Sequence, residues 1–596
     1  MATYKAPLRD MRFALYEMHD VEGLSKYPGY EEMSRDVLDA VLDESAKFCE
    51  EVLFPLNRSG DEEGCHYENG VVRTPKGFIE AYKQFRDGGW GGFATEPEWG
   101  GQGLPHMVGS LLEEMQCSAN LAFQLYGGLT QGAIRAIVMH GTQELKEKYV
   151  QKMSEATWTG TMCLTEPHCG TDLGQIRTRA VPADDGTYKI TGTKIFITGG
   201  EHDLTENIIH LVLAKLPDAP KGIKGISLFL VPKFMVKDDG NIGPRNGVMC
   251  GAIEHKMGIK GSATCVMNFD GAVGYLIGQP HKGMRAMFTM MNAARIGVGI
   301  QGIGMGEVSY QGAVAYAKDR LQGRALTGTK YPDKVADPII VHPDVRRTLL
   351  TMRATTEGTR AFAVWVSRAL DVFTHSPDAQ ERQNAEDFVA LMTPMVKALS
   401  TDLGFETTNM GVQMLGGHGY IRENGMEQYV RDARIAQLYE GTNGIQALDL
   451  VGRKLPAHAG RYLRFFFHPV AAYIEAKVED EVLSPFVQAL AKAFVRLQQA
   501  TAYIMQKGMG NPDEAGAAAT EYQRLFGLVA LAFMWCKAAE VALPKAGTAE
   551  DSDGFYKAKL NTAKFYMERV LPQTSGLFAG IMAGGKTMMS FEDAAF

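Results

Sequence analysis

The sequence predicts an α+β chain in which helical regions flank a middle domain built from a β-sheet. Apolar residues recur at helical spacing on both sides of residues 161–280, whereas short β-branched segments bounded by Gly, Pro and Asp fill that stretch. A further helical block follows near the end of the chain. With 596 residues, the chain is long enough for two to four domains.

The first helical domain is expected over 35–160, after an N-terminal extension at 1–34. Helical spacing begins near residue 32 and is clearest in two groups of apolar residues. These are Met33, Val37, Ala40 and Val41 in the first group, and Leu111, Met115 and Leu121 in the second.

The middle β domain is expected over 161–280. Its clearest strands are rich in β-branched and aromatic residues, as buried strands usually are. They are Tyr188–Thr198, Ile208–Leu213 and Ile226–Val231.

Helical spacing returns after residue 280 and predicts a helical bundle over 281–455. An additional helical domain over 465–596 follows the Pro- and Gly-containing stretch Leu455–Gly460. The pattern of the bundle starts with Met284, Met287, Phe288 and Met291.

Composition and charge argue against several classes of protein. Lys and Arg number 61 against 69 Asp and Glu, and the net charge of −8 is unlike that of a non-specific nucleic-acid binder. The longest apolar run, Leu525–Cys536, is too short to span a bilayer and predicts a buried helix. The first residues hold no hydrophobic signal core, and the eight cysteines form no CxxC pair, so a reduced, cytoplasmic protein is expected. Cys163, His168 and Cys169 lack a fourth ligand at metal-site spacing, so no metal is expected.

Two motifs suggest nucleotide binding but lack its context. Gly580–Thr587 matches GxxxxGK[ST], yet a P-loop needs a preceding strand and more sheet around it, so the end of a helix is the better interpretation. Gly297–Gly302 matches GxGxxG, with Asp319 at a suitable distance for a ribose contact, but it follows a helical pattern. The favoured interpretation is that these glycines let a helix pack closely against a neighbour. An NAD-dependent enzyme remains the second candidate class of enzyme.

Three segments far apart in sequence carry the most specific pattern. Met162–Asp172 contains Thr, Gly and Pro at a density typical of a turn with available N–H groups and hydroxyls, as a phosphate or a flavin edge would need. Lys194–Gly200 ends a predicted strand. Gln413–Gly419 is rich in glycine and is followed by Arg431–Asn443, which ends in Tyr-Glu-Gly-Thr-Asn.

In this order and spacing, the TEPxxGTD loop, the GxKxxIT strand and the YEGTN turn resemble the acyl-CoA dehydrogenase family over residues 35–455. The added helical domain is similar to that of longer bacterial members, which include enzymes acting on 3-(methylthio)propanoyl-CoA and on straight-chain fatty acyl-CoAs. The resemblance implies the family's fold of N-terminal helical domain, middle β domain and helical bundle, here with an extra C-terminal helical domain. It also implies FAD as the cofactor.

The same likeness assigns cofactor contacts residue by residue. Thr165 would meet the flavin pyrimidine, Thr171 the diphosphate and Thr198 the flavin N5. Phe196 stands where the family usually has Trp against the ring. Arg320 would reach the FAD diphosphate of a neighbouring subunit, although the family's following aromatic is here Gly323. The implied cofactor residues are Met162, Leu164, Thr165, Gly170, Thr171, Phe196, Ile197, Thr198, Arg320, Gln413, Gly416, Gly417, Thr442 and Asn443.

Desaturation of a thioester needs a base for the α-proton and an acceptor for the β-hydride. The likeness assigns the base to Glu440, whose own backbone N–H would stabilise the enolate oxygen. Some relatives carry a glutamate at the position of Ala294 instead, and Glu166 is expected to shape the FAD loop. The implied substrate contacts are Thr171, Asn292, Arg295 and Gly441.

The sequence therefore predicts an FAD-dependent acyl-CoA dehydrogenase that forms a trans-2-enoyl-CoA in fatty acid β-oxidation. One alternative is a dedicated 3-(methylthio)propanoyl-CoA dehydrogenase. An alternative of another class is a non-catalytic relative that binds CoA esters. An electron-transfer flavoprotein is the implied electron acceptor. A homodimer is expected because the family shares its cofactor sites between subunits, and the C-terminal domain would cover the surface where a second dimer could dock.

Overall fold

A computed structural model describes residues 3–596 of the chain, which forms two compact units. The bundle unit comprises the described residues up to Asp43 together with His106–Glu114 and Val298–Phe596. The sheet unit comprises Glu44–Pro105 and Met115–Gly297. The predicted α+β class is confirmed, because the strands belong to the sheet unit and the bundle unit is helical.

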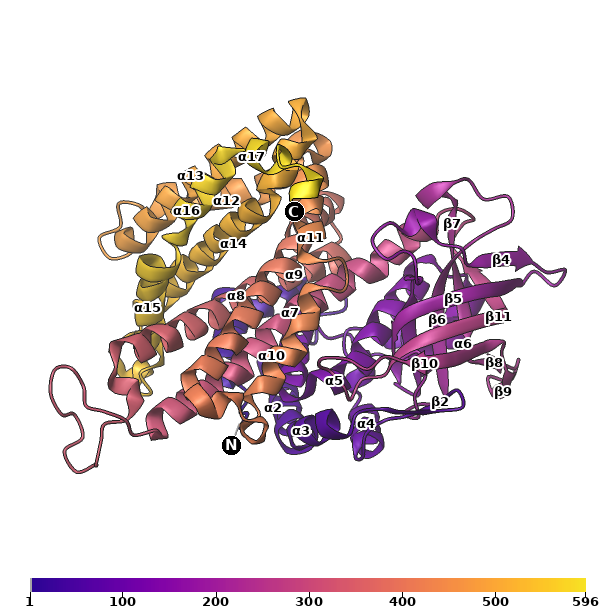
Figure 1. Ribbon diagram of the computed structural model, residues 1–596, viewed down its shortest axis with the longest axis horizontal. Coiled ribbons are helices and arrows are strands. Elements are labelled where there is room, and N and C mark those ends of the chain that lie inside the picture. Colours follow the sequence, from indigo (N-terminus) through magenta and orange to yellow (C-terminus); the bar gives the residue numbers. More distant parts are fainter. Residues whose placement is uncertain (1–2) are drawn as a thin grey trace. The chain divides into compact units, whose positions relative to one another are not determined.

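A seven-stranded sheet forms the centre of the sheet unit (Figure 1). Its strands are β3 (Trp158–Cys163), β4 (Arg179–Pro182), β5 (Tyr188–Thr198), β6 (Asn207–Lys215), β7 (Ile226–Pro232), β10 (Val248–Ile253) and β11 (Thr264–Ile277). They pair in the order β10, β11, β5, β4, β6, β3, and β7 pairs with both β11 and β6, which closes five of the strands into a ring. The three strands predicted from sequence are confirmed as β5, β6 and β7.

Two short hairpins complete the strands, β1 (His66–Glu68) with β2 (Val71–Arg73), and β8 (Phe234–Val236) with β9 (Ile242–Arg245). The first hairpin interrupts the helices expected over 35–160. Asn69 and Gly70 connect its strands with φ of 51° and 83°, as a two-residue hairpin turn requires. The Asn-Gly pair was the turn signal in the sequence.

Helices pack on this sheet to form the core of the sheet unit. Tyr149 of α6 and Trp158 of β3 are buried with ring centroids 6.1 Å apart, and Met287 of α7 joins the same apolar cluster. The helices that lie at least partly in this unit are α2 (Arg35–Phe48), α3 (Phe54–Glu63), α4 (Phe78–Asp87), α5 (His106–His140), α6 (Gln143–Ser154) and α7 (Gly283–Asp319).

The bundle unit contains the remaining helices together with parts of α2, α5 and α7. Its other helices are α1 (Leu8–Arg12), α8 (Pro343–His375), α9 (Ala379–Leu415), α10 (Met426–Arg434), α11 (Asn443–Asp449), α12 (Arg461–Lys477), α13 (Ser484–Gly510), α14 (Pro512–Ala542), α15 (Phe555–Phe565), α16 (Gln573–Ala583) and α17 (Lys586–Met589). Within this unit α7 packs against α9 through glycine: a Cβ on Gly299 would lie 2.6 Å from the carbonyl oxygen of Val396, and one on Gly302 would lie 2.4 Å from that of Ser400. The GxGxxG motif is therefore a helix-packing feature, as predicted.

The C-terminal helices pack on α8 and α9 (Figure 1). The indole N–H of Trp535 in α14 donates to the carbonyl of Ala354 in α8 at 3.1 Å, and Gln523 donates to the carbonyl of Pro394 in α9. Among residues 3–596, α14 is the one helix long and apolar enough to cross a membrane, and 83% of its most apolar stretch is buried. The predicted buried helix is confirmed, although it is longer than the apolar run that signalled it.

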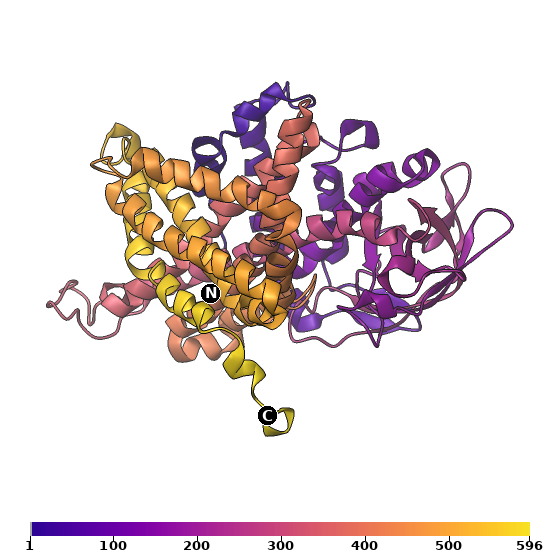
Figure 2. The same cartoon turned by 90° about the horizontal axis from the view of Figure 1, so that it is seen from above.

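The GxxxxGK[ST] motif falls on the end of α16 and on α17, so helix and not strand precedes it. The C-terminal end of the chain extends away from the other helices of the bundle unit (Figure 2). The motif therefore lacks the strand that a P-loop requires.

The helices α1 and α15, which are far apart in sequence, meet in a buried ionic cluster of the bundle unit. Arg360 of α8 lies at its centre, with Nη2 2.7 Å from Glu307 Oε2 and Nε 3.0 Å from both carboxylate oxygens of Glu114. Asp10 of α1 pairs with Arg360 and with Lys559 of α15. We call this set the ionic cluster; its members are Asp10, Glu114, Glu307, Glu357, Arg360 and Lys559.

Candidate active site

The segment Met162–Asp172 leaves β3 as a tight loop that is bonded to β5 in the sheet unit. Glu166 and Cys169 exchange two backbone hydrogen bonds of 3.0 Å, which close the loop on itself. The carbonyl of Thr165 accepts a hydrogen bond of 2.9 Å from the backbone N–H of Ile195 in β5. The structure therefore brings together the first two segments of the predicted cofactor site.

A buried ion pair holds this loop in shape. Glu166 Oε1 lies 2.8 Å from Lys194 Nζ, and both side chains are at most 3% exposed. Both carboxylate oxygens also accept backbone N–H bonds, from Arg177 at 2.7 Å and from Thr178 at 3.0 Å. Burial opposes the ionisation of Glu166, but the ammonium of Lys194 and these donors outweigh it and hold the pKa of the carboxyl below its usual value.

Glu166→Gln is expected to leave Lys194 as an uncompensated buried cation and to destabilise the sheet unit by about 3 kcal/mol. Because the pKa of Glu166 is lowered by folding, its stabilisation is present above the unfolded value of about 4.3 and is lost as the pH falls through the folded pKa. Urea denaturation should therefore show a deficit at pH 7 that shrinks below about pH 4.

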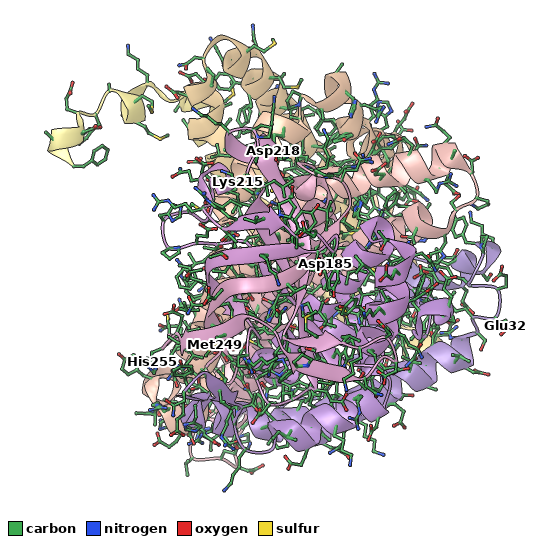
Figure 3. The ribbon with its side chains drawn as sticks, turned by 90° about the vertical axis from the view of Figure 1, so that its right-hand side faces the viewer. Glu32, Asp185, Lys215, Asp218, Met249 and His255 are labelled. Atoms are coloured by element: carbon green, nitrogen blue, oxygen red, sulfur yellow. The ribbon has the colours of Figure 1, made fainter. Side chains whose placement is uncertain are left out.

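The control for this change is Asp218→Asn, at an exposed position between β6 and β7 (Figure 3). It should alter the free energy of unfolding by less than about 0.5 kcal/mol. If Glu166→Gln lowered the free energy of unfolding equally at pH 7 and below about pH 4, a stabilising role for ionised Glu166 would be contradicted.

Phe196 is the most unusual residue of β5. Its φ is 59°, and its aromatic side chain is 60% exposed. The pairing of β5 with β11 shifts register at this point, between Cys265 and Met267, so the strand carries a bulge. Bulges and strained backbone are frequent beside binding sites, and an exposed ring offers the flat apolar face that a flavin contact requires. No feature of the sequence predicts this positive φ.

The other predicted residues of the sheet unit differ in exposure. Thr198 ends β5 half-buried and pairs with Thr264 of β11, while Thr171 in the loop is exposed. Asn292 is exposed and Arg295 is buried, one helical turn apart in α7. Thr171 and Asn292 are therefore exposed to solvent, whereas Arg295 is buried within the sheet unit.

Glu166, His168 and Cys169 place ligand-type atoms within 4.8 Å of one another. The carboxylate of Glu166 is engaged by Lys194, and His168 Nε2 lies 2.9 Å from the carbonyl of Gln175. These contacts assign the side chains of Glu166 and His168 to the architecture of the loop.

Glu440 lies in the bundle unit, in the turn between the 3-10 helix Ile435–Gln437 and α11. Its φ is 56°, and that of Gly441 is 83°. The left-handed conformation costs a residue with a Cβ about 1–2 kcal/mol, so it persists only where neighbouring contacts fix it. Thr442 ends the turn by capping α11, its hydroxyl accepting the backbone N–H of Ile445 at 3.3 Å.

Side chains from α9 and α11 hold the carbonyls of this turn. Gln446 Nε2 donates to the carbonyl of Glu440 at 2.9 Å. Lys397 Nζ donates to the carbonyl of Gly441 at 2.8 Å and to Asn443 Oδ1 at 2.7 Å. Sequence reasoning did not identify Lys397, although a lone lysine in the apolar stretch Met392–Leu399 was the available signal.

The predicted contacts to a neighbouring subunit's cofactor lie on two helix ends of the bundle unit. Arg320 directly follows α7 and is exposed, and Gln413, Gly416 and Gly417 are exposed at the end of α9. The hydroxyl of Tyr316 and Nδ1 of His418, 2.8 Å apart, join these two ends. The structure thus brings Arg320 and the glycine-rich segment onto neighbouring elements.

Four family models match successive parts of the chain. They are described as the acyl-CoA dehydrogenase N-terminal domain over residues 36–157, the middle domain over 161–272, the C-terminal domain over 281–455, and an acetyl-CoA dehydrogenase C-terminal-like domain over 454–592. Together they match well over half of the chain.

Full-length relatives support the same family. The chain is 42% identical to the 3-methylmercaptopropionyl-CoA dehydrogenase of Ruegeria pomeroyi, with 99% of each protein covered. It is 34% identical to a butyryl-CoA dehydrogenase of Syntrophomonas wolfei, with 100% of this chain and 99% of the relative covered. It is also 34% identical to the broad-specificity linear acyl-CoA dehydrogenase FadE5 of Mycobacterium tuberculosis, with both covered completely.

Solved structures share the fold. An acyl-CoA dehydrogenase from Bacillus anthracis, complexed with FAD, superposes with a TM-score of 0.74 at 20% identity and covers 100% of this chain and 94% of its own. ACDH-11 of Caenorhabditis elegans, in complex with C11-CoA, superposes with a TM-score of 0.76 at 19% identity and covers 95% and 91%. The family models and the full-length relatives together show that the chain belongs to the acyl-CoA dehydrogenase family of FAD-dependent oxidoreductases.

Proposed function

We propose that this chain removes one hydrogen from each of the α and β carbons of an acyl-CoA thioester and yields the trans-2-enoyl-CoA. The observation that carries the proposal is the turn at Glu440, where contacts from α9 and α11 hold a carboxylate-bearing residue in a strained backbone conformation. The identities of 34–42% to full-length relatives that are named acyl-CoA dehydrogenases support it.

In this proposal the carboxylate of Glu440 accepts the α-proton, and its backbone N–H donates to the thioester oxygen. FAD, when bound, supplies the acceptor for the β-hydride. The residues present fit this cofactor, since the loop Met162–Asp172 carries exposed Thr171 and β5 presents the exposed ring of Phe196. Arg320 and the end of α9 would meet the cofactor of a second subunit in a homodimer.

Two substrate classes fit the proposal. Straight-chain fatty acyl-CoAs would place the enzyme in β-oxidation, with an electron-transfer flavoprotein as the acceptor and the cytoplasm as the site of action. 3-(Methylthio)propanoyl-CoA is the second candidate, and the 42% identity to the 3-methylmercaptopropionyl-CoA dehydrogenase of Ruegeria pomeroyi favours it.

Anaerobic titration of the purified protein with acyl-CoAs of increasing chain length and with the methylthio ester tests the proposal. The flavin absorbance should bleach with at least one of these acyl-CoAs. The values of kcat/KM from turnover assays, compared between acyl-CoAs, should then identify the preferred substrate class. Since one methylene in an apolar pocket changes kcat/KM by roughly 10–200-fold, a single length should stand out in a dedicated enzyme. A flavin-containing protein that bleaches with no acyl-CoA would overturn the proposal, and a colourless protein that binds CoA esters would favour the non-catalytic alternative.

A further inference from the structure

Lys397 is a buried ammonium in the middle of α9. Its side chain is 0% exposed, and its Nζ reaches the carbonyl of Gly441 at 2.8 Å and Asn443 Oδ1 at 2.7 Å. Removing an ammonium from water costs several kcal/mol, which its interactions inside the protein must offset. A methionine or leucine could fill this position in the helix without that cost. The presence of a buried ammonium here therefore needs an explanation in terms of its contacts.

The turn that Lys397 contacts is conformationally strained. Glu440 has a φ of 56°, which a residue with a Cβ adopts only where other contacts compensate. The peptide carbonyls of Glu440 and Gly441 are held in succession, the first by Gln446 at 2.9 Å and the second by Lys397 at 2.8 Å. These two carbonyls belong to the peptide planes that flank Gly441, so holding both limits rotation at the residue directly after Glu440. The backbone of the turn can then move less, which restricts the directions open to the Glu440 side chain.

Asn443 connects this contact to a carboxylate further along α9. Its amide oxygen accepts from Lys397, and its amide nitrogen donates to Asp402 Oδ1 at 2.6 Å and to Thr401 Oγ1 at 3.0 Å. Asp402 also accepts from Gln437 Nε2 at 2.6 Å, on the other side of the turn. The segment from Gln437 to Asn443 is thus anchored at both ends by Asp402 and in the middle by Lys397.

We propose that Lys397 is a positioning residue for the base, and that its ammonium fixes the Gly441 carbonyl so that the carboxylate and backbone N–H of Glu440 keep the geometry that proton abstraction needs. This inference rests on the proposed role of Glu440. A polar group in the same place that served stability alone would change the melting temperature without changing the chemical step.

The test compares Lys397→Met and Lys397→Arg with the wild-type holoenzyme in anaerobic stopped-flow reduction by the acyl-CoA with the highest kcat/KM. Misplacing a reacting group by about 1 Å can cost on the order of 10²-fold in rate, so Lys397→Met should lower the limiting rate of flavin reduction by about that factor. The FAD content and the Kd for acyl-CoA should stay near wild type. The kinetic isotope effect with α-deuterated substrate should rise, because proton abstraction becomes more rate-limiting.

Lys559→Met is the matched control, because Lys559 is also a buried ammonium but pairs with Asp10 and Glu357 in the ionic cluster. It should lower the melting temperature and leave the reduction rate and the isotope effect unchanged. If Lys397→Met does not fold, Lys397→Arg tests the proposal in its place, because arginine keeps a buried cation but alters the geometry of its donors. A folded, FAD-bound Lys397→Arg variant with slowed flavin reduction supports the proposal.

A wild-type reduction rate and isotope effect in a folded Lys397 variant would overturn the inference. So would a rate loss that merely follows the loss of bound FAD. The variant Glu440→Gln distinguishes a wrong positioning role for Lys397 from a wrong assignment of Glu440 as the base. If Glu440→Gln abolishes reduction while the Lys397 variants do not, only the positioning role is wrong; if Glu440→Gln reduces at the wild-type rate, the proposed base is wrong as well.

Discussion

Replacing Glu440 with glutamine is expected to lower turnover by about 10²- to 10⁴-fold, the range that loss of a general base typically costs. Glutamine preserves the size of the side chain and the backbone N–H but cannot accept the α-proton. The variant should therefore keep its FAD and still bind acyl-CoA. Steady-state turnover with an artificial electron acceptor, together with an equilibrium titration of acyl-CoA binding, measures both quantities.

Glu406→Gln provides the control, because Glu406 is an exposed carboxylate on α9 that pairs with Arg524 at 2.8 Å. Wild-type turnover is expected for it. Turnover of Glu440→Gln within a few-fold of wild type would show that another group removes the proton. A loss of FAD in proportion to the loss of rate would instead indicate that the turn at Glu440 supports the cofactor.

Arg360→Met is expected to have the largest effect on stability, lowering the apparent free energy of unfolding by about 3–5 kcal/mol. The side chain of Arg360 is 1% exposed and contacts three carboxylates, Asp10, Glu114 and Glu307. Methionine fills part of the volume but removes the guanidinium that pairs with all three buried carboxylates. Urea denaturation followed by circular dichroism measures the loss.

The deficit of Arg360→Met should depend on pH. Burial raises the pKa of Glu114 to about 7, although Arg360 opposes this. A carboxyl whose folded pKa is raised contributes stability below its unfolded value of about 4.3, and that contribution is lost as the pH rises through about 7. Without Arg360 the folded pKa rises further, so the deficit should be larger at pH 8 than at pH 5.5.

The control for this pair of experiments is Arg347→Met. Arg347 forms an exposed pair with Asp344, with side chains 57% and 83% exposed, and such pairs contribute at most about 1 kcal/mol. A deficit of Arg360→Met that is below 1 kcal/mol, or that is independent of pH, would show that water or neighbouring dipoles compensate the three carboxylates.

The local features of the fold were predictable from the sequence because they depend on local patterns. β5, β6 and β7 were visible as short β-branched runs, and α7 as a helical repeat of methionines. The hairpin around Asn69 was missed because the helical spacing on both sides was extended across it. In α2, Leu38 and Leu42 are buried, whereas Val37 is half exposed. The helical spacing of apolar residues does not by itself show which side of the helix faces the core.

The candidate site was predictable only in part. Its motifs identify which residues belong to it, but they do not show that Phe196 and Glu440 adopt positive φ, because that conformation depends on contacts from distant segments. Lys397 is 43 positions from Glu440, and its ammonium reaches the turn only after α9 and α11 have packed. A lysine in an apolar helix looks the same in sequence whether it faces solvent or a backbone carbonyl.

The ionic cluster has a consequence for how the chain is made. Asp10 is synthesised long before its partner Lys559, because the two residues are far apart in sequence. At roughly 5–20 residues per second, the interval between them is on the order of 30–110 s. The sheet unit ends at Gly297 and can complete its folding in that time. The amino-terminal segment can pair Asp10 with Arg360 partway through synthesis but gains Lys559 only when α15 has emerged. A nascent chain that stalls before α15 therefore keeps the ionic cluster one cation short.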